Sequence, residues 1–293
     1  MKCTLCPREC NTLRTSPETY GFCKISHTAT VTRAAPHYWE EPCISGEKGS
    51  GTVFFAGCNL KCVFCQNHQI SRNGEFGKEV TPLQLREIFE NLKTQGVHNI
   101  NLVTPTHFAP AILQALAKPL GLPLVYNCGG YEKVETLNKW EGKVDVYLPD
   151  MKYIDPALAK EYSGAENYPE IAKEAILEMF RQVGPAVMDD QGILQKGVCI
   201  RHLILPGHTK NTLGVIEWVA NTFPKDSVLF SLMSQYTPTP AVKNHPSLSR
   251  RITKREYEKC VNAMLDAGLT NGFVQDLSSA KEEYTPPFDL TGI

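Results

Sequence analysis

From position 51 onward, two hydrophobic patterns alternate along the chain. Short, nearly continuous apolar runs such as GTVFFA (51–56) and NINLVT (99–104) predict strands buried on both faces, as in a parallel sheet. Segments with apolar residues every three or four positions predict amphipathic helices between them. The predicted strands cover 51–56, 99–104, 122–127, 144–150, 197–207, 227–233 and 272–276. The predicted helices cover 81–96, 110–118, 131–140, 168–183, 212–223 and 254–268.

The helix at 81–96 carries clear boundary signals. Thr81 and Gln84 have the spacing of a capping box, and Pro82 suits the first helical turn. Gly96 suits the end of the helix. Between the fourth and fifth strands, AVMDDQGILQKG (186–197) predicts a small hairpin.

Strands that alternate with helices predict an α/β fold with a parallel sheet. The pattern provides six or seven units, fewer than the eight of a complete barrel. We therefore expect a partial (β/α)6 TIM-type barrel over residues 51–276, with a small N-terminal Cys-rich metal-binding lobe. Residues 1–50 are assigned to this lobe and its connector, with 24–50 as the connecting part. Residues 277–293 are expected to form a C-terminal tail.

Composition and charge do not favour binding to nucleic acid or to a membrane. The chain has 30 basic and 31 acidic side chains, a net charge of −1 and no block of like charges. Its first residues, MKCTLCPREC, lack the apolar stretch of a secretory signal, and no apolar run is long enough to span a membrane. We therefore expect a cytoplasmic protein. In a reducing compartment, eleven cysteines favour metal ligation over disulfides.

Polar residues follow the predicted strands at the points where the strands end. Because the carboxyl ends of parallel strands meet at one mouth of a barrel, we expect these residues to form a site together. They are a cysteine cluster after the first strand, TPTH (104–107), NCGG (127–130), DMK (150–152), Arg201 within the fifth strand and SQYTP (234–238).

The cysteine cluster contains only three thiols, Cys58, Cys62 and Cys65. Four thiolates saturate a [4Fe–4S] cluster, whereas three leave one iron open to another molecule. The spacing therefore predicts a reactive cluster. The alternative is a zinc site that borrows a fourth ligand such as Cys43 or His68.

The stretch CNLKCVFC, with Phe64 before its last cysteine, resembles the signature loop of the radical S-adenosylmethionine (radical SAM) superfamily. The resemblance implies that the open iron binds the amino and carboxylate groups of S-adenosylmethionine. A reduced cluster then cleaves this molecule to methionine and a 5′-deoxyadenosyl radical, which abstracts hydrogen from a substrate. The resemblance thus implies an oxidoreductase with Cys58, Cys62 and Cys65 at its reactive centre. It also places Phe64 beside the cofactor.

Within the superfamily, the chain is similar to the branch of pyruvate formate-lyase-activating enzymes. More narrowly, it resembles an uncharacterised subgroup of that branch with extra N-terminal cysteines. The segments that carry this resemblance are WEEPCISGEKGSGTVFFAGCNLKCVFCQN, INLVTPTHF, YLPDMKY, RHLILPG and LMSQYTP.

The segment after the second strand departs from the superfamily pattern. Many members have a Gly-Gly-Glu there, which holds the amino group of S-adenosylmethionine, whereas this chain has VTPTH. Thr104 and Thr106 are the candidates that replace it, through their hydroxyls and the neighbouring carbonyls. The alternative is a strand-end turn with a helix cap.

Four further residues are assigned to the cofactor site by the resemblance. Asn127 is expected to bind the ribose, and Asp150 and Lys152 to lie near the cofactor and a bound cation. Arg201 is expected to pair with the carboxylate of S-adenosylmethionine, which a guanidinium can grip with two hydrogen bonds. The alternative for Asp150 and Lys152 is an ordinary ion pair. His202 directly follows Arg201, so its side chain should point to the opposite face of the strand from that of Arg201.

A second metal site is predicted from Cys3, Cys6, Cys10 and Cys23. Four thiols can close a site, and such a site would hold together a lobe that has no core of its own. The spacing suits zinc and an auxiliary iron–sulfur cluster equally.

Three functional hypotheses follow from these residues. The first is a radical SAM enzyme that acts on a protein partner, as an activase of a glycyl-radical enzyme does. The second is a radical SAM enzyme that modifies a small molecule, an RNA or a peptide. The third is a non-catalytic iron–sulfur electron carrier. Both enzyme hypotheses imply an electron donor such as flavodoxin or ferredoxin.

Overall fold

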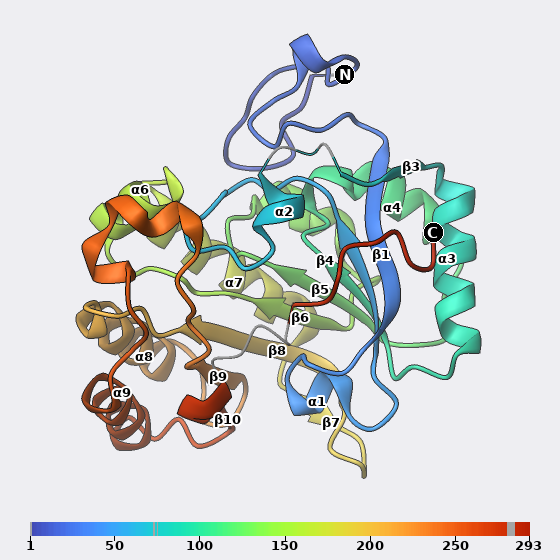
Figure 1. Cartoon of the computed structure of the whole chain (residues 1–293). Helices are drawn as coiled ribbons and strands as arrows, with labels where there is room; N and C mark the ends of the chain where they lie inside the picture. The colour runs from blue at the N-terminus through green and yellow to red at the C-terminus, as the bar shows by residue number, and fades with distance from the viewer. Residues whose placement is uncertain (1, 73, 75, 280–284) are drawn as a thin grey trace.

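A curved, mostly parallel sheet forms the centre of the computed structural model, which describes residues 2–72, 74, 76–279 and 285–293 (Figure 1). Its strands run in the order β10-β9-β8-β6-β5-β4-β2-β1-β3. Neighbours from β2 through β10 on this path are parallel, whereas β1 is antiparallel to both β2 and β3. The strands are β1 Ala29–His37, β2 Ser50–Phe55, β3 Lys78–Val80, β4 Ile100–Val103, β5 Leu124–Cys128, β6 Val146–Pro149, β7 Val187–Met188, β8 Leu194–Leu203, β9 Leu229–Met233 and β10 Gly272–Val274.

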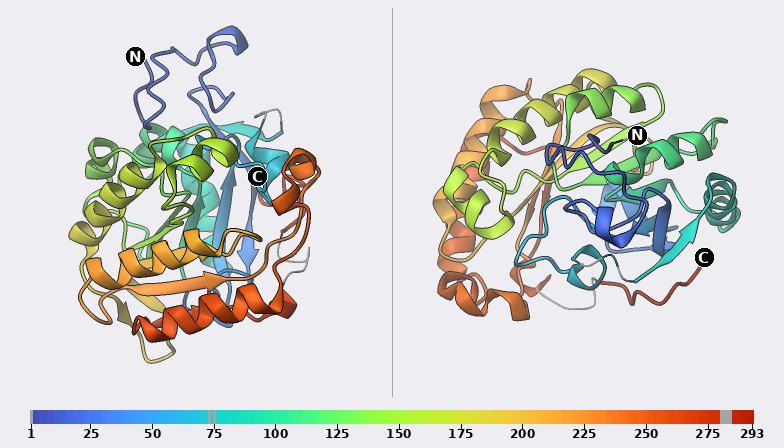
Figure 2. Two further views of the ribbon diagram at one scale, coloured as in Figure 1. Left: turned by 90° about the vertical axis from the view of Figure 1, so that its left-hand side faces the viewer. Right: turned by 90° about the horizontal axis from the view of Figure 1, so that it is seen from above.

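Helices form an outer layer around the strands, as the view from above in Figure 2 shows. This arrangement confirms the predicted α/β class and partial TIM-type barrel. All six predicted helices are present in whole or in part, and Tyr168–Val183 (α7) has the predicted limits. The helices are α1 Pro42–Ser45, α2 His68–Ser71, α3 Pro82–Thr94, α4 Ala109–Ala115, α5 Val134–Leu137, α6 Pro156–Ser163, α7, α8 Thr209–Thr222 and α9 Lys254–Asp266.

Helix α3 shows how local sequence sets an element. The hydroxyl of Thr81 accepts a hydrogen bond from the Gln84 backbone N–H, and the Gln84 side chain accepts one from the Thr81 N–H, which completes the predicted capping box. The apolar stripe of α3 is buried against the sheet: Leu85, Ile88, Phe89 and Leu92. The predicted hairpin also forms, because β7 pairs with β8.

The predicted elements do not include β1, β3, α1, α2 and α6. Residues 24–50 were interpreted as a connector, but Ala29–His37 forms β1 and extends the sheet beyond β2. The segment was missed because Arg33 and Pro36 interrupt its apolar pattern, although Pro36 lies beyond the part of β1 that pairs with β3 and is tolerated there. Helix α6 was also missed, although Asp155 caps its first turn and Pro156 suits its start.

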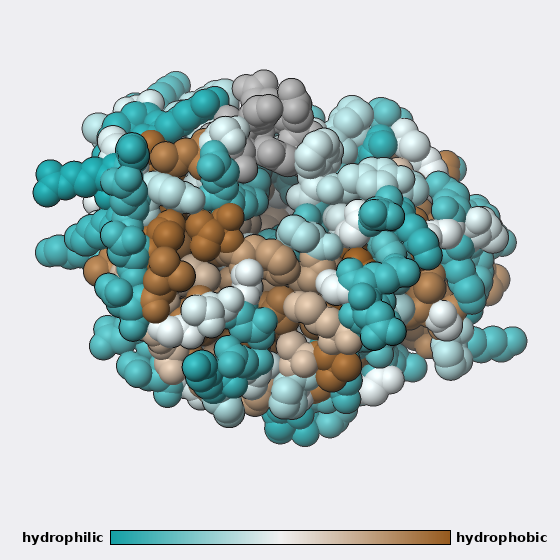
Figure 3. Space-filling model, turned by 90° about the horizontal axis from the view of Figure 1, so that it is seen from below, coloured by the Kyte–Doolittle hydropathy of each residue, from teal (hydrophilic) through white to brown (hydrophobic). Residues whose placement is uncertain are grey.

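The short helix α1 closes the lower end of the barrel (Figure 1). Its residues Cys43 and Ile44 are buried in one cluster with apolar side chains of β5, β6, β8 and β9. Asn99 also donates from Nδ2 to the Ile44 carbonyl at 2.8 Å. Figure 3 shows this lower face, where hydrophobic residues fill the middle and hydrophilic residues surround them. The chain before α1 is therefore held beneath the strand ends that carry the site.

The N-terminal lobe lies at the opposite end of the molecule, on the side of α2 (Figures 1 and 2). Two arginines fix it to the barrel. Arg8 donates to the carbonyls of Asn59 and Ser163 at 2.9 Å each. The buried Arg14 donates to the His107 carbonyl at 2.7 Å. In the described residues, no helix is long and apolar enough to cross a membrane.

Candidate active site

A cavity of about 220 Å³ opens at the carboxyl ends of the parallel strands. The loop after β2 contributes all three cysteines of the cluster motif to its wall. The cavity also collects residues from the ends of β4, β5, β6 and β8, which lie far apart in the sequence. The predicted site residues that line it are Cys58, Cys62, Phe64, Cys65, Thr104, Asn127, Asp150, Lys152 and Arg201.

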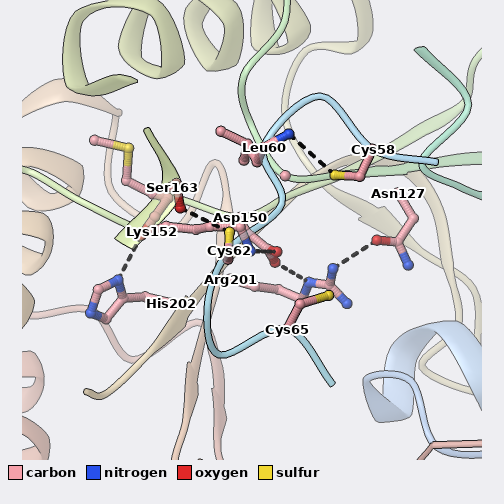
Figure 4. Close-up of polar contacts among 12 residues, drawn as sticks. Cys58, Leu60, Cys62, Cys65, Asn127, Asp150, Lys152, Ser163, Arg201 and His202 are labelled. Carbon is pink, nitrogen blue, oxygen red and sulfur yellow. Dashed lines mark hydrogen bonds and ion pairs between the residues drawn. The ribbon is translucent and has the colours of Figure 1, made fainter. Parts of the chain in front are cut away.

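Each cysteine sulfur of the loop accepts a hydrogen bond, and Figure 4 shows those to Cys58 and Cys62. The Leu60 backbone N–H donates to Cys58 Sγ at 3.4 Å, and the Ser163 hydroxyl donates to Cys62 Sγ at 3.0 Å. The Ser71 hydroxyl donates to Cys65 Sγ at 3.4 Å. Hydrogen bonds to sulfur stabilise its anionic form and tune the reduction potential of a cluster bound to it.

Burial opposes ionisation of Cys58 and Cys65 when no cation is bound. It raises the pKa of Cys58 to about 12, and the nearby Cys62 and Cys65 add to this effect. Burial also raises the pKa of Cys65. A metal centre is the natural counter-charge for three thiolates that converge in this way.

Three soft sulfur donors on one cavity wall fit an iron–sulfur cluster with one open iron. Phe64 fixes the loop from behind, because its ring packs against those of Tyr153, Tyr162 and Tyr236 at centroid distances of 6.3, 6.5 and 6.3 Å. In the part of the chain that the structure describes, no three His, Cys, Asp or Glu side chains are arranged to hold a single metal ion. The fit therefore rests on the chemistry of the sulfur donors.

In the same cavity, Asp150, Lys152 and Arg201 form a largely buried ionic group (Figure 4). Arg201 Nε donates to Asp150 Oδ1 at 2.8 Å, and Lys152 Nζ donates to Asp150 Oδ2. Burial alone would raise the pKa of Asp150, but Arg201 and Lys152 outweigh it and lower this pKa. Burial alone would lower the pKa of Lys152, but Asp150 outweighs it, so both groups are held in their charged forms.

Glu40 is the main site residue that sequence reasoning missed. It lines the cavity and accepts from Arg201 Nη1 at 3.0 Å and from Asn127 Nδ2 at 3.1 Å. Burial raises the pKa of Glu40 despite the opposing effect of Arg201. No spacing rule joins position 40 to the strand ends. The WEEP stretch contributed to the family resemblance, but nothing in it singled out Glu40.

Asn127 and Thr104 complete this part of the wall. Besides donating to Glu40, Asn127 accepts from Arg201 Nη2 at 2.7 Å. Thr104 has φ of +59°, a left-handed conformation that is unfavourable for a β-branched residue. Its backbone N–H donates to the Asn127 carbonyl at 2.8 Å. Such backbone strain is concentrated at functional sites in proteins.

Thr106 does not reach the cavity. Its hydroxyl donates to Glu132 Oε1 at 2.7 Å inside the protein, and only 1% of the residue is exposed. His202 also points away from the cavity, as the strand alternation predicts, and its ring contacts the Met151 carbonyl and the Thr212 hydroxyl.

The four N-terminal cysteines line a second, smaller cavity. The Phe22 backbone N–H donates to Cys10 Sγ at 3.2 Å, and Arg14 Nη1 lies 3.8 Å from Cys3 Sγ. Asn59, in the cluster loop, belongs to the wall of this second cavity. The lobe and the cluster loop are therefore in direct contact.

Comparisons with known proteins agree with this geometry. The family model described as the Radical SAM superfamily matches residues 52–219. The uncharacterized protein MJ0674 of Methanocaldococcus jannaschii is 31% identical over 270 residues, which cover 88% of this chain and 73% of that protein.

Solved structures show the same fold at low sequence identity. Streptococcus suis SuiB bound to the precursor peptide SuiA superposes with a TM-score of 0.52 and 14% identity, over 76% of this chain and 48% of SuiB. SuiB bound to S-adenosylmethionine gives a TM-score of 0.52 and 14% identity, over 78% of this chain and 50% of SuiB. The chain therefore spans about half the length of SuiB. Because the family model covers more than half of the chain, including the cysteine loop and the strands around it, the protein belongs to the radical SAM superfamily.

Proposed function

We propose that this protein is an enzyme that uses a [4Fe–4S] cluster on Cys58, Cys62 and Cys65 to cleave S-adenosylmethionine reductively. The observation that carries the proposal is the meeting of these cysteines and the Asp150–Lys152–Arg201 group in one cavity. When bound and reduced, the cluster supplies one electron to the sulfonium, which yields methionine and a 5′-deoxyadenosyl radical.

The residues around the cavity then have distinct roles. Arg201 has five N–H donors, of which Asp150, Glu40 and Asn127 accept three, so donors remain for the carboxylate of S-adenosylmethionine. Asp150 and Asn127 supply oxygen and amide groups suited to ribose hydroxyls. The strained turn at Thr104 offers its hydroxyl and neighbouring carbonyls to the amino group, in place of the missing Gly-Gly-Glu. Thr106 has no such role in this proposal, because Glu132 holds its hydroxyl.

The substrate is proposed to be a polypeptide. A cavity of about 220 Å³ is small beside the roughly 300–1,000 Å³ of sites for drug-sized ligands, so S-adenosylmethionine would fill it. Helix α1 closes the lower end of the barrel. A substrate must therefore reach the cavity from another side of the barrel. SuiB, which shares the fold, has been solved with a precursor peptide. Activation of a glycyl-radical enzyme and modification of a peptide both remain compatible with this class.

We also infer a second metal site at Cys3, Cys6, Cys10 and Cys23, supported by their shared cavity and by the hydrogen bond to Cys10. Zinc and an auxiliary iron–sulfur cluster both satisfy four thiols. Through Asn59, whose carbonyl accepts from Arg8, this site abuts the loop of the first cluster.

Anaerobic incubation with S-adenosylmethionine and dithionite tests the main proposal. The reconstituted protein should form 5′-deoxyadenosine, and a Cys62→Ala variant should not. Cys260→Ala is the matched control, because Cys260 is buried in α9 away from the cavity and should leave product formation unchanged. Absence of 5′-deoxyadenosine from a protein with a full complement of iron would contradict the proposal. It would favour the electron-carrier hypothesis. A glycyl-radical signal on a partner protein would identify an activase.

A further inference from the structure

The segment 285–293 lies against the β1 side of the sheet and ends in a turn, in which Leu290 and Gly292 have φ of +64° and +79°. Figure 1 shows it in dark red, crossing β1 in front of the sheet. The Ala34 N–H donates to the Thr291 carbonyl at 2.9 Å, and the Leu290 N–H donates to the Thr32 carbonyl at 3.2 Å. These bonds use backbone groups of β1 beyond Val31, where its pairing with β3 ends. The segment therefore takes the hydrogen-bonding positions that a neighbouring strand would use.

Side chains add two specific contacts to this backbone pairing. Arg33 Nη1 pairs with Asp289 Oδ1 at 2.7 Å and donates to the Pro287 carbonyl at 3.2 Å. The Phe288 ring packs edge-on against Phe54, with centroids 5.5 Å apart and planes at 74°. The aromatic contact selects for an aromatic side chain next to the acidic residue that meets Arg33.

Gly292 shows how closely the segment approaches β1. Its φ is +79°, and a Cβ added there would lie 1.9 Å from the Ala34 carbonyl oxygen. Any other residue would therefore collide with the strand and adopt a strained backbone. The surface beside β1 thus accepts a chain that turns there with a glycine opposite Ala34.

The same segment reaches the candidate active site. Thr285 and Pro286 line the cavity that holds the three cysteines, and so does Phe54, against which Phe288 packs. The sheet is open on this side, because β10 and β3 form the two ends of the strand order in the described residues. The segment thus connects the outer edge of the sheet with the cavity.

We propose that the surface beside β1 is the docking site for a polypeptide substrate, and that the segment 285–293 occupies it until such a substrate binds. The inference rests on the proposed function, because it supplies the route by which a polypeptide reaches the cavity. The matching substrate has an aromatic residue for Phe54, an acidic residue for Arg33 and a glycine opposite Ala34. Its backbone pairs with Thr32 and Ala34.

A synthetic labelled peptide with the sequence of residues 285–293, TPPFDLTGI, is the probe for this site. In the full-length Gly292→Ala variant, the collision with Ala34 should release the segment from the surface beside β1, and the peptide, which keeps its glycine, should bind there. Fluorescence anisotropy should give binding at least about tenfold tighter than to the wild type, where the attached segment competes at high effective concentration. Hydrogen exchange at the Ala34 amide should report release of the segment.

Two further proteins keep the test decisive. Gly142→Ala is the matched control, because Gly142 also has a positive φ, of +73°, but has nothing within 4 Å of an added Cβ. It should bind the peptide as weakly as the wild type. If Gly292→Ala does not fold, Asp289→Ala weakens the attached segment while the peptide keeps its own Asp289. A peptide with Phe288→Ala and Asp289→Ala should bind poorly to either variant.

Equal peptide binding by the wild type, the Gly142→Ala control and the released variants would overturn the inference, as would no binding to a variant whose Ala34 amide exchanges freely. The formation of 5′-deoxyadenosine by the wild type is measured separately. Product formation without peptide binding would remove the docking site but keep the proposed function. Peptide binding without formation of 5′-deoxyadenosine would keep the docking site but contradict the proposed function.

Discussion

Arg201 Nη1 donates to Glu40 Oε2 at 3.0 Å, which joins two residues that lie 161 positions apart in the chain. Arg201 belongs to β8, whereas Glu40 lies between β1 and α1. With Glu41 3.7 Å from the same guanidinium and Asp150 bound to its Nε, three carboxylates surround Arg201. The position of the guanidinium in the cavity therefore depends on a segment beneath the strands.

Replacing Glu40 by alanine should destabilise the protein by about 2 kcal/mol, because Arg201 and Asn127 would lose a largely buried acceptor while Asp150 still pairs with Arg201. Glu40→Gln should cost less, since an amide oxygen can still accept one of these bonds. Urea unfolding measures both changes. Glu47→Ala, an exposed change in the same stretch, should shift stability by no more than about 0.5 kcal/mol. An unchanged midpoint for Glu40→Ala would contradict a structural role for this contact.

Thr104→Gly should raise the free energy of unfolding by about 1 kcal/mol, because glycine relieves the left-handed strain at φ of +59°. Thr104→Ala should give no such gain, since alanine keeps the Cβ that opposes this conformation. Thermal unfolding of the two variants separates strain from loss of the hydroxyl. Weaker binding of S-adenosylmethionine to both variants would support a cofactor role for that hydroxyl. If alanine stabilised the protein as much as glycine, the strain argument would fail.

Stability should fall as the pH drops below about 6.5. Burial lowers the pKa of His202 to about 4, so the unfolded chain takes up a proton that the native protein does not accept until near that value. Between pH 7 and pH 5 this difference costs about 2 kcal/mol. His37, whose pKa burial also lowers to about 4, adds a similar loss. Urea unfolding at several pH values should show a shallower dependence for His202→Gln, and an identical slope would refute this assignment.

Metal analysis of a variant that lacks Cys58, Cys62 and Cys65 should still find metal in the N-terminal lobe. About four irons with matching sulfide would identify an auxiliary cluster there, and one zinc would identify a structural ion. Further replacement of Cys10, whose sulfur accepts the Phe22 N–H, should remove that metal. If the variant that lacks Cys58, Cys62 and Cys65 contained neither iron nor zinc, this result would contradict a second metal site.

Much of the fold followed from local rules. The capping box at Thr81 and the apolar stripe of α3 are encoded within one helix, so sequence alone predicted them. The three cysteines lie within eight residues, and one loop brings them together without help from distant contacts. Asn127, Asp150 and Arg201 were found because parallel strands bring their carboxyl ends to one edge of a sheet.

The amino-acid sequence by itself therefore determined the α/β alternation, the cysteine loop and the residues that end the strands. The tertiary structure decided that Ala29–His37 joins the sheet, that Glu40 reaches Arg201 and that Glu132 holds Thr106 away from the cavity. It also decided that the segment 285–293 lies beside β1. These features depend on strand register and on packing between distant parts of the chain. Periodicity and local propensity carry no information about such contacts.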